Sequence, residues 1–293
     1  MRVSNKTSPL KCRFLTKSDS DTVHAKLLEA FADYYIPFEL TDRQFKNHLL
    51  MNAVDLERSA GCFDGEEMVG FSLNGFGDWN SVSTVYDAGT GVIPAYRRRG
   101  VSESMFRMMI PEFRKQGIDQ FLLEVIVQND AAVNLYKKLG FGIERELLLM
   151  ENAGDIIPST KKAVGVQIAE LPFPEAELFS SFWDGQPSWQ NSSEAVVRSM
   201  KTKRLLGAFV AGKCVGYVAY SAGRGQVAQM AVNRDYRRRG IGTRLLEEIR
   251  AATPKKHKLQ IINLDSSITY AVRFFQKRGF TTRLAQYEMI AEL

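Results

Sequence analysis

Two segments of this chain carry residue types that could bind an anion. Each has a tyrosine, three arginines, a glycine and an aliphatic residue, and they lie 140 residues apart, at 96–101 and 236–241. An apolar run precedes each copy and a helical pattern follows it. Gly100 and Gly240 would let the backbone approach a ligand, and the free amides and dipole of the helix start attract phosphate-like groups. We therefore expect a phosphate site in each copy.

The motif differs from two common phosphate-binding sequences. It lacks the G-x-G-x-x-G pattern of dinucleotide-binding folds, and no Gly-Lys-Ser/Thr follows as in an NTPase P-loop. The alternative interpretation is a helix start with an exposed arginine cluster. Repetition favours the anion site, because a second shared phrase follows each copy, at 135–141 and 274–280. Two linked motifs repeated in order indicate a duplicated domain.

The elements that must position these motifs also follow a repeated order. A chain of 293 residues fits two domains, predicted at 1–155 and 156–293 with a polar linker around 151–162. Helices are expected at 18–32, 41–52, 97–117, 129–139, 175–182, 193–202, 235–251 and 266–277. Strands are expected at 59–63, 68–73, 84–93, 121–127, 141–150, 165–171, 205–210, 214–220, 225–232, 258–263 and 280–289. This order predicts an α/β (α+β) fold, each domain a mixed, largely antiparallel sheet flanked by helices.

The overall composition excludes several classes of protein. No apolar run approaches the length of a membrane span, and the polar N-terminus has no signal core, so we expect a cytoplasmic protein without a membrane partner. Cys12, Cys62 and Cys214 are odd in number and scattered, so a disulfide framework is not expected. The histidines are scattered too, and no metal site is predicted. Basic residues do not interleave with aromatics, so no nucleic-acid partner is expected.

Net charge is distributed unequally between the halves. Residues 1–155 carry 18 basic and 22 acidic side chains, for a net charge of −4, whereas residues 156–293 carry 21 and 11, for +10. An acidic half favours a cationic substrate and a basic half an anion. Drift of surface charge between the copies is the alternative.

The motifs resemble those of the GCN5-related N-acetyltransferase (GNAT) superfamily. The segment 237–242 fits its R/Q-x-x-G-x-G/A signature, and 97–102 fits except at Ser102, where Gly or Ala is usual. The phrase from Asn129 to Phe141 is similar to the superfamily's second signature. The resemblance implies acetyl-CoA as co-substrate, with its pyrophosphate on the glycine loop and its pantetheine along a bulged strand that has splayed from its neighbour. The residues that match these roles are Val92, Ile93, Arg97, Arg98, Arg99, Gly100, Ser102, Asn129, Val232, Arg237, Arg238, Arg239, Gly240 and Gly242.

The resemblance also implies which half is catalytic. Tyr136 matches the residue that protonates the leaving thiolate. Glu124 stands in a phrase similar to that of ribosomal-protein N-terminal acetyltransferases, in which a glutamate serves as the base. Asp87 is a rival base. When the two copies are aligned on their Gly-Phe phrases, Phe275 matches Tyr136, Asn263 matches Glu124 and Ile268 matches Asn129. A catalytic first domain and a cofactor-binding or structural second domain are therefore expected.

The leading function is an N-acetyltransferase that moves an acetyl group to a primary amine of a small molecule or peptide. Two alternatives remain: a non-catalytic acyl-CoA-binding or regulatory module, and a tandem structural protein that binds a partner. Tyr34, Tyr35 and Trp79 could line a groove for the acceptor, although packing is the commoner role of such residues. The sequence does not identify the acceptor or the oligomeric state.

Overall fold

The computed structural model describes residues 10–33, 40–221 and 223–293, which form two compact units. The first unit comprises the chain up to Glu124 together with Asp130–Gly142 and Met289–Leu293. The second comprises Val125–Asn129 and Ile143–Glu288. The units do not follow a single cut at residue 155, because most of the last strand of the first repeat belongs to the second unit. The chain's final residues belong to the first unit, where the N–H of Leu293 donates to the carbonyl of Asp119 at 2.8 Å.

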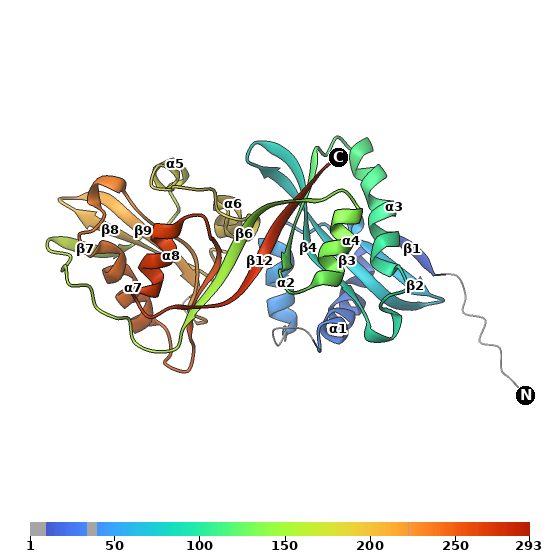
Figure 1. Cartoon of the computed structure of the whole chain (residues 1–293), viewed down its shortest axis with the longest axis horizontal. Coiled ribbons are helices and arrows are strands. Elements are labelled where there is room, and N and C mark those ends of the chain that lie inside the picture. The colour runs from blue at the N-terminus through green and yellow to red at the C-terminus, as the bar shows by residue number, and fades with distance from the viewer. Residues whose placement is uncertain (1–9, 34–39, 222) are drawn as a thin grey trace, which may run out of the picture. The chain divides into compact units, whose positions relative to one another are not determined.

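The first unit is built on a sheet in the order β1-β2-β3-β4-β5, in which neighbours are antiparallel except for β4 and β5 (Figure 1). Its strands are β1 (Lys11–Phe14), β2 (Ala60–Asp64), β3 (Glu67–Trp79), β4 (Val82–Val92) and β5 (Gln120–Ile126). Its α-helices are α1 (Ser20–Ala30), α2 (Asp42–Met51), α3 (Val101–Lys115) and α4 (Asp130–Lys138). Short 3-10 turns are η1 (Lys17–Asp19), η2 (Leu56–Arg58) and η3 (Pro94–Tyr96).

Two glycines show that helices α1 and α3 cover opposite faces of this sheet. A Cβ placed on Gly70 would lie 2.7 Å from Val101 of α3, and one on Gly91 would lie 3.0 Å from Ala30 of α1. Gly70 precedes Phe71, which pairs with Gly91, and successive strand residues point to opposite faces. The α1 face buries a mixed aliphatic and aromatic cluster that includes Phe45 and Phe71. The α3 face buries a chain of contacting rings from Phe106, Phe113, Phe121 and Phe141. The two hydrophobic layers hold α1 and α3 against opposite faces of the sheet.

The second unit repeats the plan around the strand order β12-β6-β11-β10-β9-β8-β7. Its strands are β6 (Gly142–Asn152), β7 (Val166–Glu170), β8 (Arg204–Val210), β9 (Lys213–Ser221), β10 (Gln226–Val232), β11 (Leu259–Asp265) and β12 (Thr281–Glu292), whose last residues belong to the first unit. Its helices are α5 (Ala176–Ser180), α6 (Ser193–Arg198), α7 (Ile241–Ala252) and α8 (Thr269–Gln276), with 3-10 turns η4 (Trp189–Asn191) and η5 (Arg234–Tyr236). The predicted mixed, mostly antiparallel sheets flanked by helices are confirmed.

The structure corrects two sequence predictions about helices and one about strands. Helices expected from Arg97 and from Asp235 begin at Val101 and Ile241, because the residues before them form turns with backbone angles that no helix allows. Strand β1 was not expected, because four residues that alternate between exposed and half-buried are too short a pattern to predict a strand. It forms because β2 offers it an antiparallel partner.

A disulfide is the fourth correction. Cys12 of β1 pairs in register with Cys62 of β2, and the two are joined as a disulfide, whereas Cys214 is free and buried. The two residues are separated by 50 positions, so only the pairing of β1 with β2 brings them together.

Candidate active site

Strand β4 is bulged where it parts from β5. Leu73 of β3 pairs with Gly89 and Asn74 pairs with Asp87, so Ala88 is an extra residue in β4. The parallel pairing of β4 with β5 runs from Thr84 to Asp87, whose partner is Leu123, although β4 continues to Val92. The bulge thus coincides with the end of the pairing. Beyond Asp87, this edge of β4 is where the resemblance places pantetheine.

The second unit repeats this geometry. Gln229 of β10 pairs with Ala219 and Val227 pairs with Tyr220, so Ala228 is the bulged residue, 140 positions after Ala88. Parallel pairing with β11 ends at Val227, opposite Ile261. The expected bulged strand with a splayed neighbour is therefore confirmed in both units. We call the space between β10 and β11 beyond this point the second slot.

The glycine motifs form two loops of the same conformation, the first loop (Arg97–Gly100) and the second loop (Arg237–Gly240). Arg98 and Arg238 have φ of 61° and 62°, and Gly100 and Gly240 have φ of 76° and 84°. Each glycine is the N-cap of its helix and supplies no side-chain cap. The first amides of α3 and α7 have no partner within their helices and face the loop, as an anion site requires.

The first arginine of each loop holds the protein itself. Arg97 donates to both carboxylate oxygens of Asp33 at 2.6 Å and to the carbonyl of Ala30 at 3.0 Å. Arg237 pairs with Asp184 at 2.5 Å and donates to the carbonyl of Phe182 at 2.9 Å. These guanidinium groups therefore anchor the segment that follows the first helix of each unit, and the cofactor contacts expected of them stay a prediction.

Other expected cofactor residues lie around the two loops. Val92 ends β4 and the buried Ile93 follows it, while Ser102 and Gly242 lie half-buried in the first turns of α3 and α7. A Cβ on Gly242 would lie 3.0 Å from Phe274, so a glycine there suits close packing. The exposed Arg98, Arg99, Arg238 and Arg239 and the half-buried Val232 and Asn129 keep their expected roles as predictions.

Tyr136 and Glu124 both lie near the point at which β4 and β5 part. The hydroxyl of Tyr136, on α4, donates to Asp87 Oδ2 at 3.5 Å, and Asp87 is the last β4 residue paired with β5. Glu124 follows Leu123, the partner of Asp87, and its Oε2 accepts a hydrogen bond from Tyr86 at 2.5 Å. Two carboxylates and two phenols therefore surround the end of the parallel pairing.

Asp87 has an unusual proton affinity for a carboxyl group. It is buried, and burial raises its pKa to about 6, although hydrogen bonds from Thr90, Gly89 and Tyr136 oppose that rise. The Thr90 hydroxyl lies at 2.8 Å and the Gly89 N–H at 2.9 Å. Because three donors already surround its oxygens, Asp87 is well placed to orient Tyr136 and poorly placed to reach an incoming amine.

His48 is a residue of this site that sequence reasoning missed. Its Nε2 lies 2.8 Å from the carbonyl oxygen of Ala88, the bulged residue, and its Nδ1 lies 3.2 Å from the Asn52 amide. Burial of the ring lowers the pKa of His48, which keeps it neutral. The neutral Nε2–H donor fixes one side of the bulged peptide, and Asp87 fixes the other through Gly89. A scattered histidine on a helix gave no signal of this contact 40 residues away.

The second unit has lost these chemical groups. Phe275 is buried at the position of Tyr136. Asn263, at the position of Glu124, has φ of 58°, donates to Ser188 at 3.2 Å and accepts from Gln286 at 2.9 Å. Ile268 precedes α8 where Asn129 precedes α4. Trp79, suggested as a groove residue, is buried, and Tyr34 and Tyr35 lie outside the described residues.

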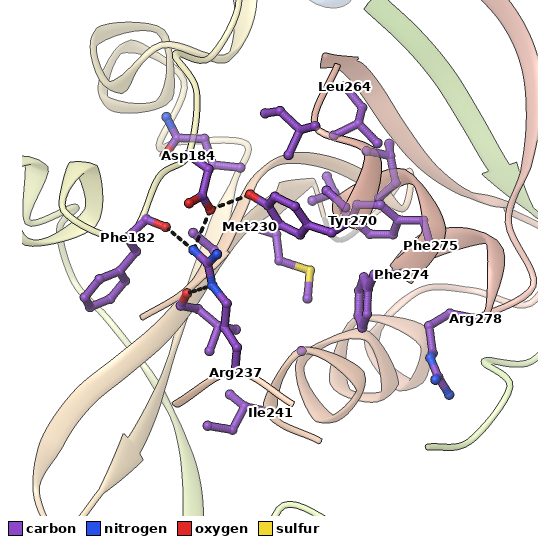
Figure 2. A pocket seen from close by; sticks show the side chains of 18 of the residues that line it. Phe182, Asp184, Met230, Arg237, Ile241, Leu264, Tyr270, Phe274, Phe275 and Arg278 are labelled. Atoms are coloured by element: carbon purple, nitrogen blue, oxygen red, sulfur yellow. Dashed lines mark hydrogen bonds and ion pairs between the residues drawn. The ribbon is translucent and has the colours of Figure 1, made fainter. Parts of the chain in front are cut away.

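The second slot opens into a cavity of about 810 Å³ within the second unit. The lining comes from β10, β11, α8, the second loop and the segment after α5, and includes Phe182, Met230, Leu264, Phe274, Phe275 and Ile241 (Figure 2). Arg237, Arg238, Arg273, Lys277, Arg278 and Lys161 add positive charge to this wall. An apolar slot with a cationic end suits a ligand that joins a flexible apolar arm to phosphates. Among the described residues, no group of three or more His, Cys, Asp or Glu side chains could hold a metal, and no helix there is long and apolar enough to cross a membrane.

Two bulged, splayed strands, each ending in a glycine loop that starts a helix, define a protein with two acyltransferase folds. Residues 24–141 match the model of the acetyltransferase (GNAT) family, and residues 178–289 match that of the acetyltransferase (GNAT) domain. The chain belongs to the GNAT family and carries two such domains in tandem.

Curated relatives and solved structures agree with this assignment. The chain is 33% identical over 73 residues to N-alpha-acetyltransferase 30 of Saccharomyces cerevisiae, covering 23% of this chain and 42% of that protein. It is 32% identical over 92 residues to the [ribosomal protein bS18]-alanine N-acetyltransferase of Escherichia coli K12, covering 29% of this chain and 62% of that protein. The matches therefore span about half the length of these relatives.

Two solved structures share the fold over nearly the whole chain. A GCN5-related N-acetyltransferase from Sphaerobacter thermophilus superposes with a TM-score of 0.70 at 17% identity, covering 97% of this chain and 95% of that one. A tandem GNAT protein from the clavulanic acid biosynthesis pathway superposes with a TM-score of 0.69 at 18% identity, covering 97% and 98%. At these identities the likeness shows the fold alone.

Proposed function

We propose that this chain is an acetyl-CoA-dependent N-acetyltransferase and that its first unit transfers the acetyl group to a primary amine. One observation carries the proposal. Tyr136 and Glu124 both stand where β4 and β5 part, through Asp87 and its partner Leu123, and the matching positions of the second unit hold Phe275 and Asn263. A binding module has no need of an acid and a base at that point.

The chemistry assigns one proton to each group. Direct attack forms the C–N bond and breaks the C–S bond of the thioester, so the amine loses a proton and the thiolate needs one. Glu124, half-buried and held by Tyr86, takes the amine proton. Before transfer, Asp87 holds the Tyr136 hydroxyl in place. The hydroxyl then turns from Asp87 toward the departing sulfur and gives its one proton to the thiolate, while Thr90 and Gly89 still donate to Asp87.

The first loop and the edge of β4 supply the binding site for acetyl-CoA. The amides that open α3, next to the left-handed Gly100, suit the pyrophosphate, and Ser102 adds a hydroxyl in the same turn. The open edge of β4 from the bulge to Val92 offers backbone groups to the pantetheine. His48 and Asp87 hold the bulge from its two sides, so this edge is rigid before the co-substrate binds.

The acceptor class is proposed from the relatives. The yeast relative is named as an N-alpha-acetyltransferase, and the bacterial one as an enzyme that acetylates an alanine of a ribosomal protein. We therefore place a peptide or protein α-amine ahead of a small-molecule amine. The net charge of −4 in residues 1–155 suits either, because both are cations before they react.

The second unit is proposed to bind an acyl-CoA without turning it over. The intact second loop and the cavity of about 810 Å³ support binding. The loss of the tyrosine and glutamate positions argues against turnover there.

Thiol release from acetyl-CoA with a panel of amines tests the function. The panel contains a peptide with an N-terminal alanine, the same peptide with a blocked N-terminus and an internal lysine, a polyamine and an amino sugar. The proposal predicts amine-dependent thiol release with the free N-terminal peptide as the best acceptor. Release with only a small amine would overturn the acceptor class, and amine-independent background alone would favour the non-catalytic binding module.

A further inference from the structure

A side-chain contact crosses the mouth of the second slot. The Tyr270 hydroxyl, on α8, donates to a carboxylate oxygen of Asp184, which lies in the segment after α5. Asp184 is also paired with Arg237 of the second loop at 2.5 Å and with Arg234 at 2.7 Å. This chain of groups, which we call the latch (Tyr270, Asp184 and Arg237), joins three elements that line one cavity.

The latch spans the mouth of the second slot and does not fill the cavity behind it. Figure 2 shows the Tyr270 side chain reaching across the pocket toward Asp184, next to Met230 of β10. The Arg237 guanidinium carbon lies 5.5 Å from the centre of the Tyr270 ring. The cavity of about 810 Å³ exists with these contacts in place, which is ample for a ligand arm. Since Tyr270 keeps 49% of its surface exposed, it lies at the boundary between the cavity and solvent.

The linker closes a second side of the same cavity. The guanidinium of Arg278, which follows α8, donates to the carbonyl of Ile157 at 2.7 Å, and the backbone carbonyl of Arg278 accepts from the Ile157 N–H at 3.3 Å. Further along, the carbonyl oxygen of Lys161 would lie 2.4 Å from a Cβ placed on Gly240. The linker therefore passes directly over the second loop, at a separation that only a glycine permits, and Pro158–Lys161 form part of the cavity wall.

The first unit keeps the anchor of the latch but lacks its tyrosine. Asp33 pairs with Arg97 as Asp184 pairs with Arg237. The position that matches Tyr270 is Ala131, which has no hydroxyl to donate. Among the described residues, nothing lies within 4 Å of a Cβ placed on Gly100. The tyrosine bridge and the linker contact are thus features of the second unit's site.

We propose that the latch makes the second slot a retaining site, which holds one acyl-CoA and exchanges it slowly. The ligand class is a phosphopantetheine thioester, because the cavity joins an apolar slot to a cationic loop. The inference rests on the proposed binding of acyl-CoA by the second unit. Release of the ligand requires the Tyr270 hydrogen bond to a charged carboxylate to break first, so the latch slows both entry and exit.

Release of labelled acetyl-CoA from the full-length chain tests the latch. Gly100→Glu blocks the first loop, so the label remaining after rapid gel filtration reports the second site. A chase with excess unlabelled CoA then gives the release rate for Gly100→Glu alone and for Gly100→Glu with Tyr270→Phe. Losing a hydrogen bond to a charged group should speed release about tenfold or more. Tyr96→Phe in the same background is the matched control, because it removes a tyrosine–aspartate hydrogen bond of 2.8 Å in the first unit. Its release rate should stay within about twofold of the parent.

Two results would overturn the proposal. One is a release rate for Tyr270→Phe equal to that of the Tyr96→Phe control. The other is the absence of any acetyl-CoA bound by the Gly100→Glu chain while its thermal unfolding shows that it is folded. Release is measured in a chain without turnover at the first loop. A failure of the latch is therefore seen separately from a failure of acetyl transfer, which thiol release reports.

Discussion

Asp87 and Tyr136 illustrate how one contact sets both proton affinity and geometry. The carboxyl is buried because it follows the β4–β5 pairing into the interior, and it remains polar because Thr90, Gly89 and Tyr136 donate to it. Burial outweighs these bonds and raises the pKa of Asp87 to about 6. The Asp87 carboxyl therefore has a pKa of about 6 in the folded chain. In the unfolded chain its pKa would be about 4.

The first prediction concerns Asp87 and pH. Above pH 6 the charged carboxylate holds the Tyr136 hydroxyl, and below it the protonated carboxyl holds it less well, so turnover at saturating substrates should fall as pH drops through about 6. Asp87→Asn should lower turnover about tenfold at pH 7.5 and remove that decline.

The folded pKa of Asp87 lies above the unfolded one, so the buried charge costs stability at neutral pH and the cost disappears as pH falls toward 4. Urea unfolding should therefore show no loss of stability in Asp87→Asn at pH 7.5. A dependence of turnover on pH that is the same in Asp87→Asn as in the parent chain would contradict the role given to Asp87.

The second prediction concerns His48, whose pKa is lowered by burial. A folded pKa below the unfolded value of about 6.5 means that stability is present above pH 6.5 and declines as pH falls below it. His48→Gln keeps a donor for the Ala88 carbonyl and cannot be protonated, so it should lose this acid sensitivity. His48→Leu leaves that carbonyl without its donor and should cost about 1–3 kcal/mol at pH 7.5.

His24 provides the matched control for His48. Its Nε2 lies 2.7 Å from the Leu40 carbonyl, and not from the carbonyl of the bulged Ala88. Substitutions of His24 by Gln and Leu should therefore leave turnover unchanged, whereas the same substitutions of His48 should not. Turnover and urea unfolding measured for both pairs of variants separate a positioning role from a purely structural one. Equal turnover losses at His24 and His48 would contradict the role of His48 at the bulge.

At the scale of elements, a buried ion pair fastens β6 to β12 within the second unit. Arg145 of β6 donates from Nε and from its second terminal nitrogen to the two oxygens of Glu288 of β12, at 2.7 and 3.0 Å. Glu288 is fully buried, and burial raises its pKa even though Arg145 opposes the rise. Arg145 also donates to the carbonyl of Gln186 at 2.6 Å, which places the segment that carries Asp184.

The third prediction follows from this pair. Glu288→Gln removes the fully buried carboxylate from the Arg145 guanidinium, which keeps its pair with Asp265 at 3.3 Å, and should destabilise the chain by about 3 kcal/mol. Arg145→Met combined with Glu288→Leu should recover a large part of that loss, because both charges of the Arg145–Glu288 pair are then gone and Asp265, which stays charged, has a side chain that is 13% exposed. Lys46→Gln, which breaks the exposed pair with Asp42, should change stability by less than about 0.5 kcal/mol. Urea unfolding of the three variants is the measurement, and similar losses of stability for the buried and exposed pairs would contradict the prediction.

The same elements show what sequence reasoning could and could not reach. The repeated loop, the Gly-Phe phrase and the apolar periodicity are local patterns, so the order of the helices and of every strand except β1 followed from them. The two bulged strands were expected only from the resemblance to the GNAT superfamily. The starts of α3 and α7 were misplaced by four and six residues, because left-handed turns at Arg98 and Arg238 have no strong sequence signature. His48 with Ala88, Cys12 with Cys62 and Tyr270 with Asp184 are contacts between distant segments. Only the assembled sheets and helices bring those residues together.

At the scale of the whole molecule, the two units share one plan and differ in the chemical groups they carry. Both units keep the bulge, the loop and the arginine–aspartate anchor. Only the first keeps Tyr136 and Glu124, and Tyr270 belongs to the second. The account that fits these differences is turnover in the first unit and retention in the second.

The fourth prediction uses the charge of the two halves. Residues 1–155 have a net charge of −4, and an amine acceptor is a cation before it reacts. Long-range attraction should raise the encounter rate and weaken with salt, whose screening length is about 10 Å at 0.1 M. With acetyl-CoA saturating, kcat/KM for the acceptor should fall as ionic strength rises. A flat or rising profile would indicate a neutral or acidic acceptor.

The most direct test of the account is the turnover of Tyr136→Phe with the best acceptor, measured as thiol release together with the KM for acetyl-CoA. The substitution gives the first unit the side chain that the second unit has at Phe275. It keeps the aromatic ring and removes only the hydroxyl. If Tyr136 protonates the leaving thiolate, kcat should fall about 10²-fold or more while the KM for acetyl-CoA changes little. Near-normal kcat in this variant would remove Tyr136 from the mechanism and contradict the assignment of the chemistry to the first unit.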